Sequence, residues 1–248
     1  MWRDTRLLAR AHRGGEPVLR LFGFRPPSIT LGRSQSPEGE LDLARCVEDA
    51  IPWAVRPTGG RAVFHDQEWT FSLTAALDDA SWGGPPGRAY TRTCALIVAS
   101  LERLSVPATF ATGARSARAR AGPGGHAALP CFGSTARHEV VLRGRKLVGI
   151  AQRRTARALI QQGSLLLGDG HARLPDYQAL PSEERARARR TLAQSCATAA
   201  PWLGADPPFD RWARVLRELL PSATCLDAAA GAFLLTASGD ASYTSSVA

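Results

Sequence analysis

Residues 144–154 read Gly144-Arg145-Lys146-Leu147-Val148-Gly149-Ile150-Ala151-Gln152-Arg153-Arg154. This stretch predicts the second strand of a β-hairpin, because the β-prone run 138–142 precedes it and the polar turn 143–145 joins the two. Side chains alternate across a strand, so Lys146, Val148 and Ile150 are expected on one face and Leu147 and Gly149 on the other. The absent side chain of Gly149 would leave room for a ligand beside this strand.

The order of expected strands and helices on both sides of the hairpin predicts an α+β fold, with a mixed, largely antiparallel sheet and helices packed on it. Strands are expected at residues 18–24, 28–33, 53–56, 61–76 and 158–167, and helices at 41–50, 88–104, 182 onward and 209–220. The 248 residues fit one domain, 1–248. Its portion 182–248 is expected to be helical, with the last ten residues frayed.

The composition narrows the class of protein. No apolar run is long enough to cross a membrane, and the start of the chain is charged, so a soluble cytoplasmic protein is expected. The five cysteines are widely spaced and form no CxxC pair, which argues against a disulfide framework and against a metal site. The net charge of +9 comes from scattered arginines without a nucleic-acid-binding motif. Such a surface suits an acidic protein partner better than a specific nucleic acid.

Lysine is nearly absent from this sequence. Of the 31 basic residues, Lys146 is the single lysine and the others are arginines. A lysine can give up its proton when its surroundings lower its pKa, whereas an arginine stays charged. Lys146 therefore either has a chemical role that arginine cannot fill or is an accident of drift, and composition alone leaves both interpretations open.

Two further stretches could carry chemistry. Residues 56–65 read Arg56-Pro57-Thr58-Gly59-Gly60-Arg61-Ala62-Val63-Phe64-His65. Paired glycines between arginines can hold a carboxylate, a thioester oxygen or a phosphate, although a simple tight turn has the same composition. Cys131 follows a run rich in Gly, Ala and Arg and precedes the hairpin, which would make its thiol accessible. A structural cysteine is the alternative there, as a packed histidine is for His65.

The order of these motifs resembles the biotin/lipoate protein ligase and octanoyltransferase superfamily. The resemblance covers residues 18–167 and rests on four motifs in family order: 19–35, 56–65, 144–152 and Gln161-Gln162-Gly163-Ser164-Leu165. Cys131-Phe132 makes the chain most similar to the cysteine-dependent octanoyl-[acyl carrier protein]:protein N-octanoyltransferases. The expected fold is that of a biotin/lipoate ligase catalytic domain.

The resemblance implies an acyltransferase of lipoate biosynthesis. It would move an octanoyl or lipoyl group from a carrier-protein thioester to a lysine of a lipoyl-accepting domain or a glycine cleavage H-type protein. Cys131 and Lys146 would be catalytic, and no cofactor would be needed. The implied substrate-binding residues are Arg56, Thr58, Gly59, Gly60, Arg61, His65, Gly149, Gln152 and Gly163.

Two alternatives remain beside this interpretation. The first is an ATP- and Mg-dependent lipoate-protein ligase without a C-terminal domain, and the second is a non-catalytic protein that binds a carrier or lipoyl domain. The sequence departs from the family at Arg61, where many ligases have a third glycine, at Ile150, where a small residue is common, and at Gln162, where a histidine is common. The departure at Ile150 leaves the preferred acyl-chain length open.

Overall fold

The computed structural model describes residues 1–111, 139–204, 206–220, 224–226, 232–236 and 242–245. Its fold is α+β, as predicted, and the main sheet has nine strands in the order β10-β12-β11-β1-β5-β9-β8-β7-β6. All neighbours in this sheet run antiparallel except β10 and β12. The strands are β1 (Val18–Phe22), β5 (Glu68–Ala76), β6 (Thr109–Phe110), β7 (Val140–Leu142), β8 (Arg145–Arg154), β9 (Ala158–Leu166), β10 (Thr224–Leu226), β11 (Ala232–Thr236) and β12 (Ser242–Ser245).

A smaller sheet has the order β3-β2-β4, with β2 parallel to β3 and antiparallel to β4. Its strands are β2 (Ser28–Leu31), β3 (Trp53–Val55) and β4 (Val63–His65). The helices are α1 (Trp2–His12), α2 (Pro37–Glu40), α3 (Leu43–Glu48), α4 (Pro86–Arg103), α5 (Ser182–Ser195), α6 (Ala200–Leu203) and α7 (Phe209–Leu219), and a 3₁₀ helix η2 covers Asp169–Tyr177. None of the helices in the described part of the chain is long and apolar enough to span a membrane.

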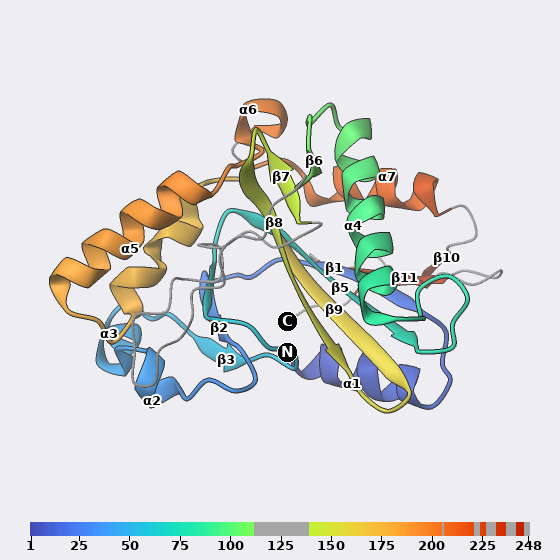
Figure 1. Ribbon diagram of the computed structural model, residues 1–248, viewed down its shortest axis with the longest axis horizontal. Coiled ribbons are helices and arrows are strands. Elements are labelled where there is room, and N and C mark those ends of the chain that lie inside the picture. The colour runs from blue at the N-terminus through green and yellow to red at the C-terminus, as the bar shows by residue number, and fades with distance from the viewer. Residues whose placement is uncertain (112–138, 205, 221–223, 227–231, 237–241, 246–248) are drawn as a thin grey trace.

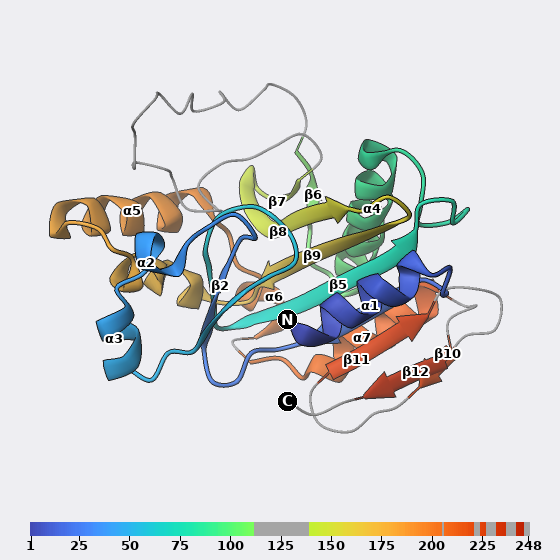
Figure 2. The same cartoon turned by 90° about the horizontal axis from the view of Figure 1, so that it is seen from below.

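Helices cover the two faces of the main sheet in different ways. Figure 1 shows α4 and α7 on one face and α1 on the other. The α4–α7 face holds the main core, where Trp212 stacks on Trp69 with ring centroids 5.3 Å apart and donates a hydrogen bond to Ser100 of α4. On the opposite face, Leu8 and Ala11 of α1 pack against Ala158 and Ile160 of β9. The turned view in Figure 2 shows α1 running along β5 and β9.

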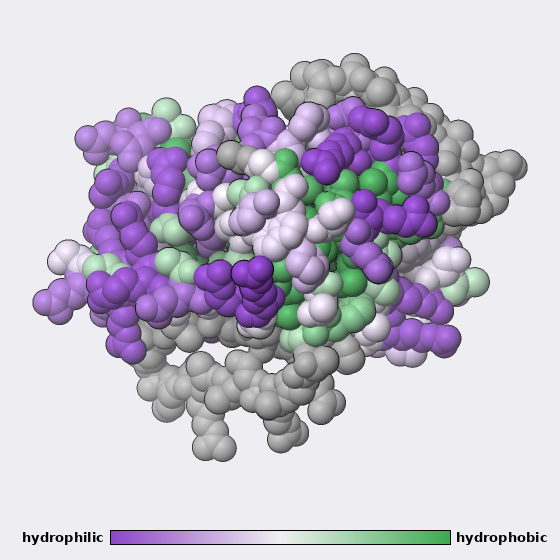
Figure 3. All heavy atoms as spheres, turned by 90° about the horizontal axis from the view of Figure 1, so that it is seen from above, coloured by the Kyte–Doolittle hydropathy of each residue, from purple (hydrophilic) through white to green (hydrophobic). Residues whose placement is uncertain are grey.

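The small sheet and helices α2, α3, α5 and η2 lie to one side of α1 (Figure 2). A second core joins them, and it includes Phe64, Leu166, Tyr177 and Leu192. Figure 3 shows hydrophilic side chains over the α5 side of the molecule, while apolar ones gather toward α4 and α7. The three arginines at positions 187, 189 and 190 of α5 are all exposed.

The C-terminal part differs from the prediction. Residues 182–248 were expected to be helical and then frayed, but the helices end at Leu219 and three strands follow. Of these, β11 pairs with β1 and so extends the main sheet. Residues 232–236, Ala-Phe-Leu-Leu-Thr, are β-prone, but they have no alternating pattern that would reveal a partner far away in the sequence.

The predicted phase of β8 is also wrong. Val140 pairs with Val148, whereas its neighbour Val141 pairs with Lys146, so Leu147 is an extra residue in β8. Such a β-bulge reverses the alternation beyond it. Gly149 therefore shares the face of Lys146, while Val148 belongs to the main core on the other face.

Candidate active site

A partly open cavity is lined by residues of the main sheet and of the small sheet. The space between its atoms amounts to about 500 Å³, including the open mouth. Its apolar lining is Met1, Phe22, Phe24, Val63, Gly149, Ile150, Ala151 and Gly163, and its polar lining is Thr30, Arg56, His65, Thr70, Lys146, Gln162 and Ser164. An apolar cavity with a few polar groups is typical of a small-molecule site.

The floor of the cavity is a row of residues across four strands. Strand register places Phe22 of β1, Thr70 of β5, Ser164 of β9 and Gly149 of β8 side by side, and all four line the cavity. We call this set the central row. Because Gly149 has no side chain, the cavity can approach the β8 backbone directly.

A second row lies two residues further along the same strands and is more polar. It consists of Arg20, Ser72, Gln162 and Ala151, and we call it the polar row. Side chains two residues apart on a strand point to the same face, so the polar row faces the same side as the central row. Gln162 and Ala151 of this row line the cavity, and Arg20 and Ser72 donate hydrogen bonds to Asp4 of α1.

Lys146 lies at the other end of the cavity. Its side chain is buried, and Nζ donates a hydrogen bond of 2.8 Å to Oε1 of Glu139, whose side chain is buried as well. The carbonyl of Lys146 accepts a hydrogen bond from Ala197, in the segment that follows α5. A charge-assisted bond of this kind fixes the position of the ammonium group. The single lysine of the sequence is thus held in one orientation at the cavity wall.

His65 belongs to a buried chain of hydrogen bonds on the far wall. Its Nδ1 lies 2.6 Å from Glu68 Oε1, and its Nε2 lies 2.6 Å from the hydroxyl oxygen of Thr30. Thr70 and Ser164 also donate hydrogen bonds to Glu68 Oε1. The imidazole stacks on Phe24 with ring centroids 4.0 Å apart. His65 is therefore a fixed part of the wall, with both ring nitrogens occupied.

Arg56 holds the glycine loop in place. Its guanidinium donates to the carbonyl oxygens of Thr30, Gly59 and Arg61, at distances between 2.7 and 3.1 Å. These bonds span both sides of the Thr58-Gly59-Gly60 turn. Arg56 lines the cavity, but these donors are directed to the backbone of its own loop and of β2.

A close backbone contact makes glycine necessary at position 32. A Cβ atom on Gly32 would lie 1.8 Å from the carbonyl oxygen of Gly60, so any side chain there must displace the loop. We expect Gly32→Ala to lower the free energy of unfolding by about 1–3 kcal/mol, as other overpacked sites do. Urea denaturation would measure it. Gly39→Ala is the matched control, because its Cβ would meet only Ser36 Cβ at 4.0 Å. Equal stability of the two variants would contradict this expectation.

Gln162 links the glycine loop to helix α1. Its Oε1 accepts a hydrogen bond of 2.7 Å from the Thr58 hydroxyl, and its Nε2 donates one of 2.5 Å to Asp4. Asp4 is completely buried and also accepts hydrogen bonds from Arg20 and Ser72. The residue that departs from the family's histidine therefore joins three separate segments around the cavity.

The structure brings some of the predicted site residues together. Lys146, Arg56, His65, Gly149 and Gly163 line the cavity. Thr58 lies behind Gln162, and the loop residues Gly59, Gly60 and Arg61 lie outside the lining of this cavity, although Gly60 and Arg61 border a separate pocket.

The remaining predicted site residues are Gln152 and Cys131. Gln152 pairs with Gln161 on the opposite face of the sheet, and its Nε2 donates to the carbonyl of Pro86 at the start of α4. Cys131, the predicted nucleophile, lies outside the described residues.

Three cysteines of the described residues, Cys46, Cys94 and Cys196, are buried and take part in no disulfide bond. Burial raises the pKa of the Cys94 thiol to about 12. Burial raises the pKa of Cys196 to about 11 although Lys146 lies close enough to lower it. Both thiols therefore stay protonated near neutral pH, which is typical of inert, structural cysteines.

The sequence model of the lipoyl protein ligase A/B catalytic domain matches residues 2–219. The chain belongs to this family. Octanoyltransferase LipM of Kyrpidia tusciae is 35% identical over 214 residues, which cover 84% of this chain and 76% of that protein. Octanoyltransferase LipM of Moorella thermoacetica is 37% identical over 158 residues, which cover 63% of this chain and 56% of that protein.

A solved structure shares the fold of this lipoyl protein ligase A/B family member. It is a bipartite lipoate protein ligase from Thermoplasma acidophilum, studied with its E2 lipoyl domain. The match has a TM-score of 0.63 at 21% identity and covers 88% of this chain and 76% of that chain. The predicted superfamily and fold are confirmed.

Three acidic groups of this family member were missed by sequence reasoning: Asp4, Glu68 and Glu139. For Glu139 a weak signal existed, since it stands seven residues before the single lysine and across the predicted hairpin from it. Asp4 and Glu68 lie in segments whose partners are distant in the sequence, so no local spacing could have found them.

Proposed function

We propose that this protein is an acyltransferase of lipoate biosynthesis, which moves an octanoyl or lipoyl group from a carrier-protein thioester to a lysine of a lipoyl-accepting protein. The observation that carries the proposal is the position of Lys146, buried at one end of an apolar cavity and ion-paired with Glu139. The names of the relatives, octanoyltransferase LipM, support the same reaction.

The chemistry proposed is ping-pong transfer through Cys131. The Cys131 thiol loses its proton and its thiolate attacks the thioester carbonyl. A new C–S bond forms, the C–S bond to the carrier breaks, and the carrier sulfur takes up the proton that Cys131 released. The amine of the acceptor lysine then attacks the acyl-enzyme, an amide bond forms, and the Cys131 sulfur is released. We place Lys146 beside this sulfur, where it would accept the thiol proton or, as an ammonium, stabilise the thiolate.

The walls of the cavity have separate roles in this scheme. The central row, which includes Gly149, would hold the acyl chain. Arg56 would act by holding the Thr58-Gly59-Gly60 loop, whose Thr58 hydroxyl donates a hydrogen bond to Gln162 at the cavity wall. His65 and Glu68 would keep the opposite wall rigid, since their hydrogen bonds join it to Thr30 of β2 and to Thr70 and Ser164 of the central row.

The partners we propose are an octanoyl-acyl carrier protein as donor and a lipoyl domain or a glycine cleavage H-type protein as acceptor. The exposed arginines of α5 suit an acidic carrier, since complementary charge steers association. The related Thermoplasma system pairs a ligase with an E2 lipoyl domain. The reaction would need no ATP or metal. Because it would depend on the thiol of Cys131, it fits the reducing cytoplasm.

Intact-protein mass spectrometry tests the proposal. The purified protein is mixed with octanoyl-acyl carrier protein without ATP. We expect a mass gain of one octanoyl group, which Cys131→Ala removes and Cys94→Ala, a change at a buried thiol, does not. No gain, together with ATP-dependent modification of a lipoyl domain by free lipoate, would instead show a ligase in which Cys131 is structural. No acyl transfer with or without ATP would favour a non-catalytic binding protein.

A further inference from the structure

The cavity ends, on the side away from Lys146, against the first turn of α1. Met1 immediately precedes α1 and lines the cavity, and its Sδ lies 3.6 Å from Nε2 of Gln162. Gln162 and Ala151 of the polar row line the cavity at the same end. A flexible thioether beside two strand residues thus closes the space between the helix and the sheet.

This end of the cavity is firmly anchored. The carboxylate of Asp4, in the first turn of α1, accepts hydrogen bonds from Arg20 Nη1 at 2.9 Å, Ser72 Oγ at 2.8 Å and Gln162 Nε2 at 2.5 Å. These donors are the three polar members of the polar row, and they come from three neighbouring strands. Because Asp4 is completely buried, the first turn of α1 cannot slide along the sheet without breaking a buried ion pair.

The position of this end fits the length of a medium acyl chain. Lys146 and Ala151 are five residues apart on β8, which is at most about 16 Å at about 3.3 Å per residue. The lysine side chain occupies part of that span. An extended octanoyl chain has seven C–C bonds and reaches about 8 Å, because three backbone bonds extend about 3.6 Å. An acyl group with its carbonyl near Lys146 Nζ would therefore bring its methyl end close to Met1.

We propose that Met1 and Gln162 form the end wall of the acyl cavity and set the longest acyl chain that the site accepts. This inference rests on the proposed acyl transfer and adds to it the residues that determine chain length. Ile150, the residue singled out from the sequence, has a smaller part in this. It borders the cavity and pairs with Gly163, but its side chain packs against the main core.

Two opposite changes test the end wall. Met1→Ala, carried behind a short N-terminal leader that supplies the start codon, would lengthen the cavity. A buried methylene is worth about three- to fourfold in affinity, so two carbons predict about a tenfold rise in the decanoyl-to-octanoyl ratio of kcat/KM. Ala151→Leu would fill the same end, and we expect the octanoyl-to-hexanoyl ratio to fall about tenfold.

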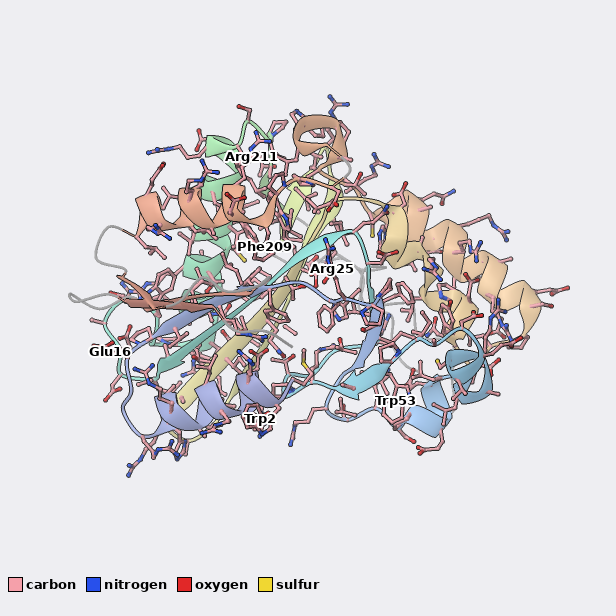
Figure 4. All side chains as sticks on the ribbon, turned by 180° about the vertical axis from the view of Figure 1, so that it is seen from behind. Trp2, Glu16, Arg25, Trp53, Phe209 and Arg211 are labelled. Atoms are coloured by element: carbon pink, nitrogen blue, oxygen red, sulfur yellow. The ribbon has the colours of Figure 1, made fainter. Side chains whose placement is uncertain are left out.

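The controls separate the end wall from general damage. The same leader with Met1 retained, and the same leader with Trp2→Ala, should keep the wild-type chain-length profile. Trp2 is 68% exposed and lies at the start of α1 with its ring on the outside of the molecule (Figure 4). Unchanged chain-length ratios in both Met1→Ala and Ala151→Leu, with octanoyl transfer retained, would overturn the end wall while leaving the proposed function intact.

A binding measurement reads the end wall without turnover. Calorimetry with S-hexanoyl-, S-octanoyl- and S-decanoyl-pantetheine should show the same shifts in Kd. If the variants shift Kd in this way but the wild-type protein transfers no acyl group, the result would support the end wall and contradict the proposed function. Equal affinities of all variants for every chain length would overturn the end wall.

Discussion

Replacing Lys146 by arginine is expected to lower octanoyl transfer by about 10²–10⁴-fold, the usual contribution of a positioned proton-transfer group. The guanidinium keeps a positive charge for the buried Glu139, so the protein should still fold. It cannot release a proton and does not place a compact charge where the Lys146 ammonium lies. The rate of octanoyl transfer to a lipoyl domain, with the unfolding midpoint measured alongside, checks this result.

Arginine is the informative substitution at this position because alanine would leave Glu139 charged and without its lysine in a buried site. Arg145→Lys is the matched control. It exchanges the same two residue types one position earlier, at an exposed site, and it should transfer at the wild-type rate. Wild-type activity in Lys146→Arg would show that Lys146 supplies only charge, and would remove proton transfer by this lysine from the proposed mechanism.

Asp4→Ala is expected to destabilise the protein by about 3–5 kcal/mol, the typical effect of removing one partner from a buried ion pair. Arg20 would stay buried without its counter-charge, and Ser72 and Gln162 would lose their acceptor. The free energy of unfolding from urea titration measures the effect. Asp4→Asn should fall between Asp4→Ala and the wild type, because the amide oxygen can still accept hydrogen bonds.

The control for Asp4→Ala is Asp210→Ala in α7. Asp210 also pairs with an arginine, Arg214, but both side chains are more than half exposed. An exposed pair of this kind contributes about 0–1 kcal/mol. If Asp4→Ala and Asp210→Ala proved equally mild, α1 would not be anchored through Asp4, and the rigid end of the cavity would lose its basis.

The sequence by itself determined the fold class and most of the elements. Short β-prone runs such as 18–24 and 158–167, separated by turn signals, are local patterns, and they appear in the structure as β1 and β9. The amphipathic pattern of 88–104 likewise predicted α4, because helix and strand periods depend only on near neighbours. Because the sequence contains a single lysine, it pointed to Lys146 without any structural information.

Only the tertiary structure decided which groups meet. The bulge at Leu147 depends on pairing with β7, and it moved Gly149 to the face of Lys146. The hydrogen bonds of Gln162 join it to Thr58 and Asp4, which are 104 and 158 positions away. The pairing of β11 with β1 joins residues as far apart as Val18 and Thr236. Local spacing carries no signal for such contacts, because they form only when separate strands lie in register and buried polar groups must find partners within the folded chain.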